Sequence, residues 1–79
     1  MGSNAVETVT MDARVLRGCA CNGELLVRDR ETDQEVRVRT AHAGRFRAGE
    51  DICIRYNGIM TMSIPPQINA DRICRGRCS

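Results

Sequence analysis

The chain has 79 residues, enough for one small domain, and 42% of them are hydrophobic while only 3% are aromatic. Twelve arginines, no lysine and ten acidic residues give a net charge of +2, which lacks the strongly basic footprint of a typical nucleic-acid-binding domain. No stretch of 18 apolar residues occurs, so the sequence predicts no membrane-spanning helix. A chain of this size hides only about 60% of its unfolded surface on folding. It therefore has few residues with which to line and support a preorganised cleft, and we predict that it is not an enzyme.

Residues 1–10 are predicted to form a flexible N-terminal segment. The first twelve residues, "MGSNAVETVTMD", lack the basic start and the apolar stretch of a signal peptide. The sequence therefore leaves the location unknown, and it is cytoplasmic if the sequence is taken as given. Export is the alternative if a leader has been removed.

Two-residue alternation of apolar and polar side chains is the main pattern after that segment. In "EVRVRT" and "DICIRY" every second residue is valine, isoleucine or another residue suited to a core, and arginine recurs between them. Such alternation is typical of half-buried strands, because successive side chains of a strand point to opposite faces. The pattern predicts six short strands, over about 11–19, 24–30, 35–40, 51–56, 59–63 and 67–74.

The breaks between these strands are typical of β-structure as well. The polar stretch "DRETDQE" predicts a hairpin, and "HAGRFRAGE" contains the one candidate helical turn. Asn57-Gly58 is a two-residue hairpin signal, since both residue types tolerate positive φ. Pro65-Pro66 cannot donate to a central ladder, so the chain must leave the sheet there or follow its edge.

Short strands with almost no helix predict a closed sheet, because closure removes the exposed strand edges. We predict an all-β fold, a small five- to six-stranded closed or partly open barrel that is OB-like, with an SH3-like barrel as the alternative. The barrel is expected to occupy residues 11–75 as a single domain. Residues 76–79 are expected to form a C-terminal tail.

The segment 46–73 carries a more specific pattern. "FRAGEDICIRYNG" followed by "SIPPQ" gives a Gly-acidic step into a strand, an aromatic and a glycine at its end, and then Ser-x-Pro-x-Gln. The positions are Gly49, Glu50, Asp51, Tyr56, Gly58, Ser63, Pro65 and Gln67. This pattern resembles a family of small uncharacterised bacterial domains, often found in exported or lipid-anchored proteins. The resemblance implies an OB-like fold, and it implies no particular reaction.

Five cysteines in 79 residues are the most informative side chains, and four of them form the local pairs "CAC" and "CRGRC". If the first and last strands are near neighbours, the two pairs converge. One interpretation is a tetrahedral zinc site, although "CAC" is shorter than the usual knuckle. Its ligands would be Cys19, Cys21, Cys74 and Cys78. A second is two disulfides with one thiol left over. The third, which we favour, is reduced cysteines that pack or sit exposed.

Other candidate chemistry is sparse. The sole histidine, His42, lies in a predicted loop with no identifiable partner, so no nucleophile and base are predicted. Met60 and Met62 would share one face of the predicted strand 59–63, where they suit either core filling or a soft ion such as copper(I). Apart from the zinc alternative, we predict no cofactor.

Binding remains as the expected role. An unknown protein is the expected partner, because short strands leave edges that another chain can extend. The alternative is single-stranded nucleic acid on an arginine-rich face, although the chain offers only two aromatic residues for base stacking. The arginines that would form this face are Arg37, Arg39, Arg45, Arg47 and Arg55.

Overall fold

The structure is a computed structural model that describes residues 8–19 and 22–78. Its secondary structure consists of β1 (Val9–Cys19), β2 (Glu24–Asp29), β3 (Glu35–Arg39), η1 (Ala43–Arg45), β4 (Asp51–Tyr56) and β5 (Gln67–Arg75). The 3-10 turn η1 is the one helical element of the described residues and falls within the predicted helical turn. The fold class is therefore all-β, as predicted.

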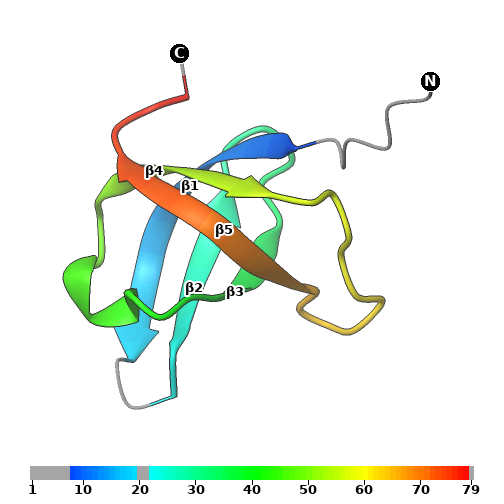
Figure 1. Cartoon of the computed structure of the whole chain (residues 1–79), viewed down its shortest axis with the longest axis horizontal. Coiled ribbons are helices and arrows are strands. Elements are labelled where there is room, and N and C mark those ends of the chain that lie inside the picture. Colours follow the sequence, from blue (N-terminus) through cyan, green and yellow to red (C-terminus); the bar gives the residue numbers. More distant parts are fainter. Residues whose placement is uncertain (1–7, 20–21, 79) are drawn as a thin grey trace, which may run out of the picture.

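The five strands close into a ring in the order β1-β2-β3-β5-β4, so each strand has a partner on both sides (Figure 1). Every seam is antiparallel except the one between β3 and β5. At that parallel seam the Arg37 N–H donates to the Pro66 carbonyl oxygen at 2.8 Å. Pro66 has no N–H to donate, and it enters the ladder through its acceptor. Closure confirms the predicted small barrel.

β1 is long because it serves two neighbours. Its first part pairs with β4 and its second part pairs with β2. The β1–β2 register shifts between Val15 and Arg17, so one extra residue lies in β1. A bulge of this kind bends a strand and increases its twist. The bend lets one strand follow the curve of the ring from β4 to β2.

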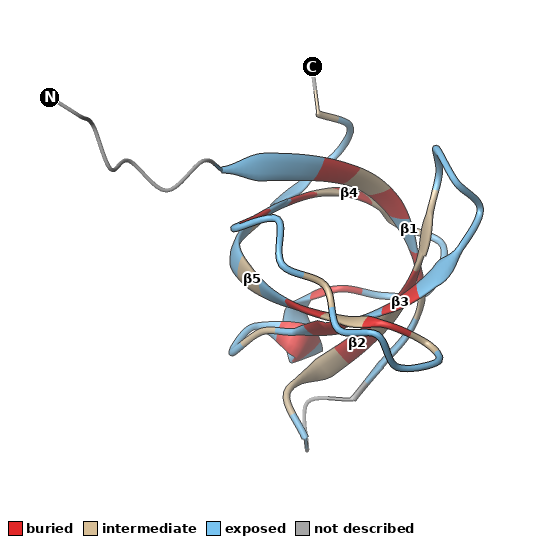
Figure 2. Cartoon of the chain, turned by 90° about the vertical axis from the view of Figure 1, so that its right-hand side faces the viewer, coloured by how far each residue is buried: buried red, intermediate tan, exposed pale blue. Residues whose placement is uncertain are grey.

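The interior of the ring is filled by side chains from all five strands and from the η1 segment, and Figure 2 shows these buried stretches around the ring. The core consists of Met11, Ala13, Val15, Leu25, Val27, Val36, Val38, Ala43, Phe46, Ile52, Ile54, Tyr56 and Ile68. No charged residue of the described part is buried. The alternation in "EVRVRT" and "DICIRY" thus places apolar side chains inward, as predicted.

The turn η1 packs against the second part of β1, and Gly18 makes this contact close. A Cβ at Gly18 would lie 2.7 Å from Leu25 Cδ2 and 3.3 Å from the Ala43 carbonyl oxygen. Leu25 is fully buried, so its side chain has little freedom to move aside. The absence of a side chain at Gly18 therefore positions η1 against the ring.

The prediction of a sixth strand is wrong, because no strand forms over 59–63. The chain instead leaves β4 in a loop of residues 57–66 before β5 returns along β4. Asn57 and Gly58 do turn the chain: the Asn57 side chain accepts from the Ile59 N–H at 3.0 Å, and Gly58 has a φ of 85°. They open a long loop and not a two-residue hairpin.

The predicted domain boundaries differ by a few residues. β1 begins at Val9 and not at residue 11, because Val9 already pairs with Tyr56 of β4. The predicted flexible segment 1–10 therefore overlaps the barrel at its end, and residues 1–7 lie outside the described residues. β5, the last strand of the barrel, ends at Arg75.

A disulfide between Cys53 and Cys78 ties the C-terminal tail to β4. Cys74 is exposed and free. The favoured prediction of reduced cysteines is therefore wrong for Cys53 and Cys78 and confirmed for Cys74. Cys21 and the side chain of Cys19 lie outside the described part of the structure.

We predict that Gly18→Ala lowers the free energy of unfolding by about 1–3 kcal/mol, because the added methyl overpacks against Leu25. Urea unfolding followed by circular dichroism measures the change. Leu25→Val removes the atom that the new Cβ meets, so the double variant should lose less stability than the sum of the two single variants. Additive losses would contradict the proposed contact.

Removal of the disulfide by Cys53→Ser should lower the free energy of unfolding by about 3.5 kcal/mol, since the bond closes a loop with a sequence separation of 25. The matched control is Cys74→Ser, which removes a thiol and opens no loop. It should change stability by less than about 0.5 kcal/mol. Equal losses in the two variants would show that the cross-link does not stabilise the fold.

Candidate functional site

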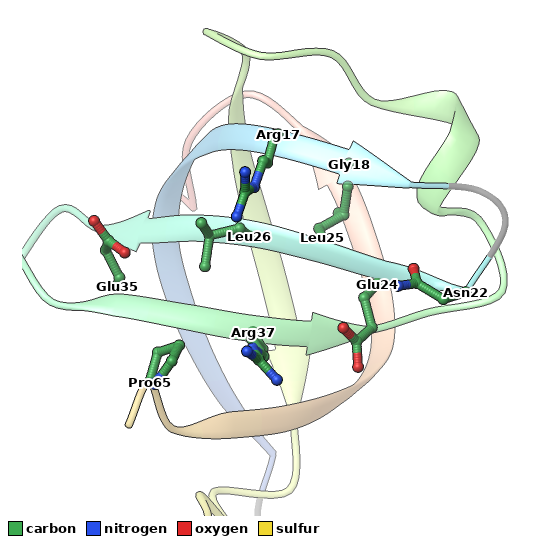
Figure 3. Close-up of a pocket in the computed structure, with 9 residues that line it drawn as sticks. All are labelled: Arg17, Gly18, Asn22, Glu24, Leu25, Leu26, Glu35, Arg37 and Pro65. Atoms are coloured by element: carbon green, nitrogen blue, oxygen red, sulfur yellow. The ribbon is translucent and has the colours of Figure 1, made fainter. Parts of the chain in front are cut away.

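A hollow of about 610 Å³ lies on the outer face of the barrel over β2 and β3, and we call it the β2–β3 groove (Figure 3). Its walls come from three consecutive strands, from the turn before β2 and from the loop before β5. The residues that line it are Arg17, Gly18, Asn22, Glu24, Leu25, Leu26, Glu35, Arg37 and Pro65.

The strand register places three outward side chains in a row across this groove. Leu26 lies opposite Arg17 of β1 and also opposite Arg37 of β3. Directly opposed residues have their Cβ atoms on one face, about 4.5–5.5 Å apart. Leu26 is thus an apolar side chain between two guanidinium groups, which are planar donors suited to carboxylate or phosphate.

Acidic side chains border this row on both sides. Glu24 lies opposite Arg39, and Arg28 Nη2 donates to Glu35 Oε2 at 3.3 Å. Glu24 and Glu35 both line the groove. The groove therefore presents charges of both signs around an apolar centre, and it is not a uniformly basic track.

The loop of residues 57–66, which we call the β4–β5 loop, is the second notable surface. Four large hydrophobic residues are exposed in the described part of the chain, and three of them lie in this loop: Ile59 at 69%, Met62 at 98% and Ile64 at 98%. No charged residue occurs from Tyr56 to Ala70. In Figure 1 the loop stands out from the ring in yellow.

Hydrogen bonds tie the second half of the β4–β5 loop to the first residue of β5. The Thr61 N–H donates to the Gln67 carbonyl oxygen at 3.0 Å, and the Gln67 N–H donates to Thr61 Oγ1 at 2.8 Å. Ser63 Oγ lies 2.6 Å from Thr61 Oγ1 and donates to the Pro65 carbonyl oxygen at 3.0 Å. The Ile64–Pro65 peptide bond is cis. The polar residues of the segment therefore shape the loop, and Ile59, Met62 and Ile64 face solvent.

The two methionines of this region do not share a face. Met60 is half-buried and packs against the core, whereas Met62 is exposed. The strand on which the copper(I) alternative depended does not form. His42 is exposed, and its backbone N–H donates to Thr40 Oγ1 at 3.1 Å.

The five arginines of the predicted nucleic-acid face lie on three parts of the barrel. Arg37 and Arg39 point outward from β3, Arg45 and Arg47 lie at and just after η1, and Arg55 lies near the far end of β4. Arg37 is the one of the five that lines the β2–β3 groove. The ion pairs found among the described residues use other arginines: Arg14, Arg28, Arg30 and Arg75.

The zinc site predicted from Cys19, Cys21, Cys74 and Cys78 is wrong as a four-cysteine set. Cys78 is bonded to Cys53, and a disulfide sulfur is not a thiolate ligand. β4 also separates β1 from β5 in the ring, so the first and last strands are not neighbours. Within residues 8–19 and 22–78 no three His, Cys, Asp or Glu side chains are placed so that they could hold a metal ion.

A second hollow, of about 580 Å³, lies where β1 and β4 meet the C-terminal tail. It is lined by Val9, Thr10, Met11, Asp12, Asp29, Arg30, Glu31, Tyr56, Arg77 and Cys78. The Cys78 N–H donates to Asp12 Oδ1 at 2.6 Å. This hydrogen bond fixes the tail to β1, in addition to its disulfide with β4.

Glu50 joins the segment after η1 to the end of β5. The Arg47 N–H donates to Glu50 Oε1 at 2.6 Å, and Arg75 Nε donates to Oε2 at 3.0 Å. The hydrogen bond from Arg47, with help from the charge and hydrogen bond of Arg75, holds the pKa of Glu50 below its ordinary value against the effect of desolvation. Arg75 also bonds the Arg45 carbonyl oxygen and lies 5.1 Å from the centre of the Phe46 ring.

Asp51, the first residue of β4, binds two arginines. Its Oδ1 lies 3.4 Å from Arg14 Nε and 3.0 Å from Arg30 Nη1. Desolvation raises the pKa of Asp51, but the hydrogen bonds and charges of these arginines outweigh it, so the pKa lies below its ordinary value. Both carboxylates therefore stabilise the folded state in their ionised form.

A lowered folded-state pKa means stability that is present above the unfolded-state pKa and lost as pH falls through the folded-state value. We therefore expect the thermal unfolding midpoint to drop between about pH 5 and about pH 3. The double variant E50Q/D51N should show a smaller drop over the same interval. Glu31→Gln, at an exposed carboxylate, is the control, and an unchanged drop in the double variant would contradict the assignment.

Sequence reasoning missed the β4–β5 loop as an exposed surface, because the apparent strand over 59–63 assigned its methionines to a sheet. The available signal was the run without charge from Tyr56 to Ala70. It also missed Leu26 at the centre of the groove. That residue follows Leu25 directly, and only the register decides which of the two faces outward.

Comparisons of the chain with protein families, with curated proteins and with solved structures found no match. Among the described residues no helix is long and apolar enough to cross a membrane. The fold and its surfaces define a five-stranded closed β-barrel that carries a shallow charged groove and a protruding apolar loop.

Proposed function

We propose that this chain is a small protein-interaction module without catalytic activity, built on an OB-like barrel. The strand order supports the OB-like assignment over the SH3-like alternative: three antiparallel strands are followed by a parallel β3–β5 seam and closure through β4. The resemblance of residues 46–73 to small OB-like bacterial domains agrees with this assignment.

The exposed apolar tip of the β4–β5 loop is the observation that carries the proposal. Met62 and Ile64 place almost their whole surface in solvent. Single exposed apolar residues are common, but a cluster of them on one segment is typical of a contact surface. Methionine is also enriched in protein interfaces relative to the rest of the surface.

The shape of the loop adds to the argument. The hydrogen bonds that join Thr61, Ser63 and Gln67 bridge the backbone of residues 61–67 without any partner. A segment that is ordered in advance loses less conformational entropy on binding. A shaped, protruding loop fits an apolar pocket on another protein, where its tip side chains act as anchors.

The chemistry of the loop favours protein over lipid or nucleic acid. Recognition of anionic lipid headgroups uses clusters of lysine and arginine, and nucleic-acid binding uses arginine and exposed aromatic rings. The segment between Arg55 and Asp71 contains no charge, and its single aromatic residue, Tyr56, is buried. An apolar protein pocket is the partner surface that this composition matches.

A photo-cross-linking amino acid at position 62 tests the proposal in cells of the source organism. We expect covalent adducts with one protein partner, whereas the same group at Glu31, an exposed position on the β2–β3 turn, should give none. Mass spectrometry identifies the adduct. Adducts with lipid or nucleic acid, or equal protein adducts at both positions, would overturn the proposal.

For the identified partner, Met62→Ser and Ile64→Ser should each weaken the affinity about 10- to 100-fold. Burial of one such side chain contributes about 1.5–3 kcal/mol, and 1.4 kcal/mol corresponds to a factor of ten. Isothermal titration calorimetry with purified proteins measures the loss. Val9→Ser, at an exposed apolar residue of β1, is the matched control and should retain the affinity of the unmodified chain.

A second candidate function is binding of single-stranded nucleic acid along the β2–β3 groove. It is favoured by Arg17 and Arg37, which face the groove and take part in none of the ion pairs found among the described residues. However, Phe46 and Tyr56 are buried, at 8% and 7% exposure, so the outer face offers no ring for base stacking.

We therefore expect only weak, salt-dependent binding of a labelled single strand, with a Kd of about 10⁻⁴ M at physiological salt. Fluorescence anisotropy measures it. A Kd below about 10⁻⁶ M that is lost in R17A/R37A would exceed the usual non-specific range and would favour this second function over the first.

A further inference from the structure

Three cysteines meet on the outer face of the barrel where β4, β5 and the C-terminal tail come together. Cys53 of β4 is bonded to Cys78 of the tail, and it lies opposite Cys74 of β5 in the antiparallel register. Cys74 is exposed and carries a free thiol. Cys53 therefore has both a disulfide partner and a thiol neighbour.

The ladder brings Cys53 and Cys74 to a separation that a disulfide can span. The Gly76 N–H donates to the Asp51 carbonyl oxygen at 2.8 Å, which marks this opposed pair as a hydrogen-bonded one. Cys53 and Cys74 are two positions further along and form the same kind of pair. Its Cα atoms lie about 5.5 Å apart. Disulfides span Cα separations of roughly 4.4–6.8 Å with Cβ atoms about 3.5–4.5 Å apart, so the opposed Cβ atoms, about 5.5 Å apart in the ladder, must approach by about 1 Å as the bond forms.

We propose that this cluster is a thiol–disulfide exchange site in which Cys74 and Cys78 alternate as the partner of Cys53. The Cys74 thiol loses its proton to solvent, and the thiolate attacks Cys53 Sγ. The Cys53–Cys74 bond forms as the Cys53–Cys78 bond breaks, and Cys78 leaves as a thiolate that takes up a proton. One disulfide and one thiol stand on each side of the step, so it consumes no oxidant or reductant.

The two connectivities differ little in the loop that they close. Cys74 precedes Cys78 by four positions in a loop with a sequence separation of 25, and the closure entropy depends only on the logarithm of loop length. The equilibrium between the Cys53–Cys78 and Cys53–Cys74 forms is therefore set by local contacts of the tail. The clearest of these is the hydrogen bond from the Cys78 N–H to Asp12 Oδ1 at 2.6 Å.

The exchange changes what the C-terminal tail can do. In the Cys53–Cys78 form the tail is bonded to β4, and Cys78 lines the second hollow beside β1. In the Cys53–Cys74 form the tail follows β5 without a covalent tie, and its last cysteine carries the thiol. The barrel can thus present a free thiol either on a strand or on its tail.

Trypsin separates the three cysteines, because the chain has arginines at positions 47, 55, 72, 75 and 77. Cys53 falls in the peptide 48–55, Cys74 in 73–75 and Cys78 in 78–79. The oxidised protein is incubated without oxygen at pH 6, 7 and 8, quenched with acid and an alkylating agent, and digested. We expect the link 48–55/73–75 to appear beside 48–55/78–79. Its rate should rise from pH 6 to pH 8, because the thiolate is the attacking form.

Three variants make the result decisive. Asp12→Ala removes the acceptor that holds Cys78 and should raise the share of the 53–74 link about three- to tenfold, whereas Asp12→Asn keeps an acceptor oxygen and should not. Cys78→Ser should form the 53–74 link on mild oxidation. A Cys78→Ser protein that stays reduced, or wild type that shows only the 53–78 link at every pH, would overturn the proposal. So would a rearranged link from Cys53 to the peptide 18–28 in place of 73–75.

Discussion

The ring depends on one strand that pairs with two neighbours. β1 pairs with β4 along residues 9–14 and with β2 along residues 13–19, and the second seam runs across the bulge. The bend at the bulge lets β1 join both neighbours, so the sheet has no free edge. Closure lets a thin set of apolar side chains bury itself completely in a chain of 79 residues. The bulge also brings Gly18 to the inside of the curve, where η1 packs against the ring.

Closure also decides where the remaining side chains can act. Since the interior is occupied by the core, every polar or reactive group of the described strands lies on the outer surface, in a shallow groove or on a loop. β4 lies between β1 and β5, so its outer face meets the C-terminal tail as well as β5. This placement brings the three cysteines of β4, β5 and the tail together. The register of β1, β2 and β3 aligns the side chains that line the groove. The β4–β5 loop is the long connection through which the chain leaves β4 and returns as β5.

Local sequence patterns predicted much of the fold, but they did not predict how most of the surface side chains are arranged. The alternation around Val36 and Ile52 identified two strands and their buried faces, because period two depends only on backbone geometry. The same logic failed over 59–63, where apolar residues alternate but have no strand to pair with. The disulfide partner of Cys53 was not predictable, since cysteine spacing does not reveal which strands lie side by side. The row formed by Arg17, Leu26 and Arg37 likewise depends on the strand register. That register includes a bulge in β1, which no residue type in the sequence indicates.

The parallel seam between β3 and β5 has a consequence for how the barrel opens. Its register joins three residue pairs, from Arg37–Gln67 to Arg39–Asn69, against five or more at each other seam. A short ladder loses its bonds in fewer steps, so backbone amides there should exchange with solvent sooner than those at the β1–β4 seam. We therefore expect the barrel to open first along this seam, which lies beside Pro65, where the groove borders the apolar loop.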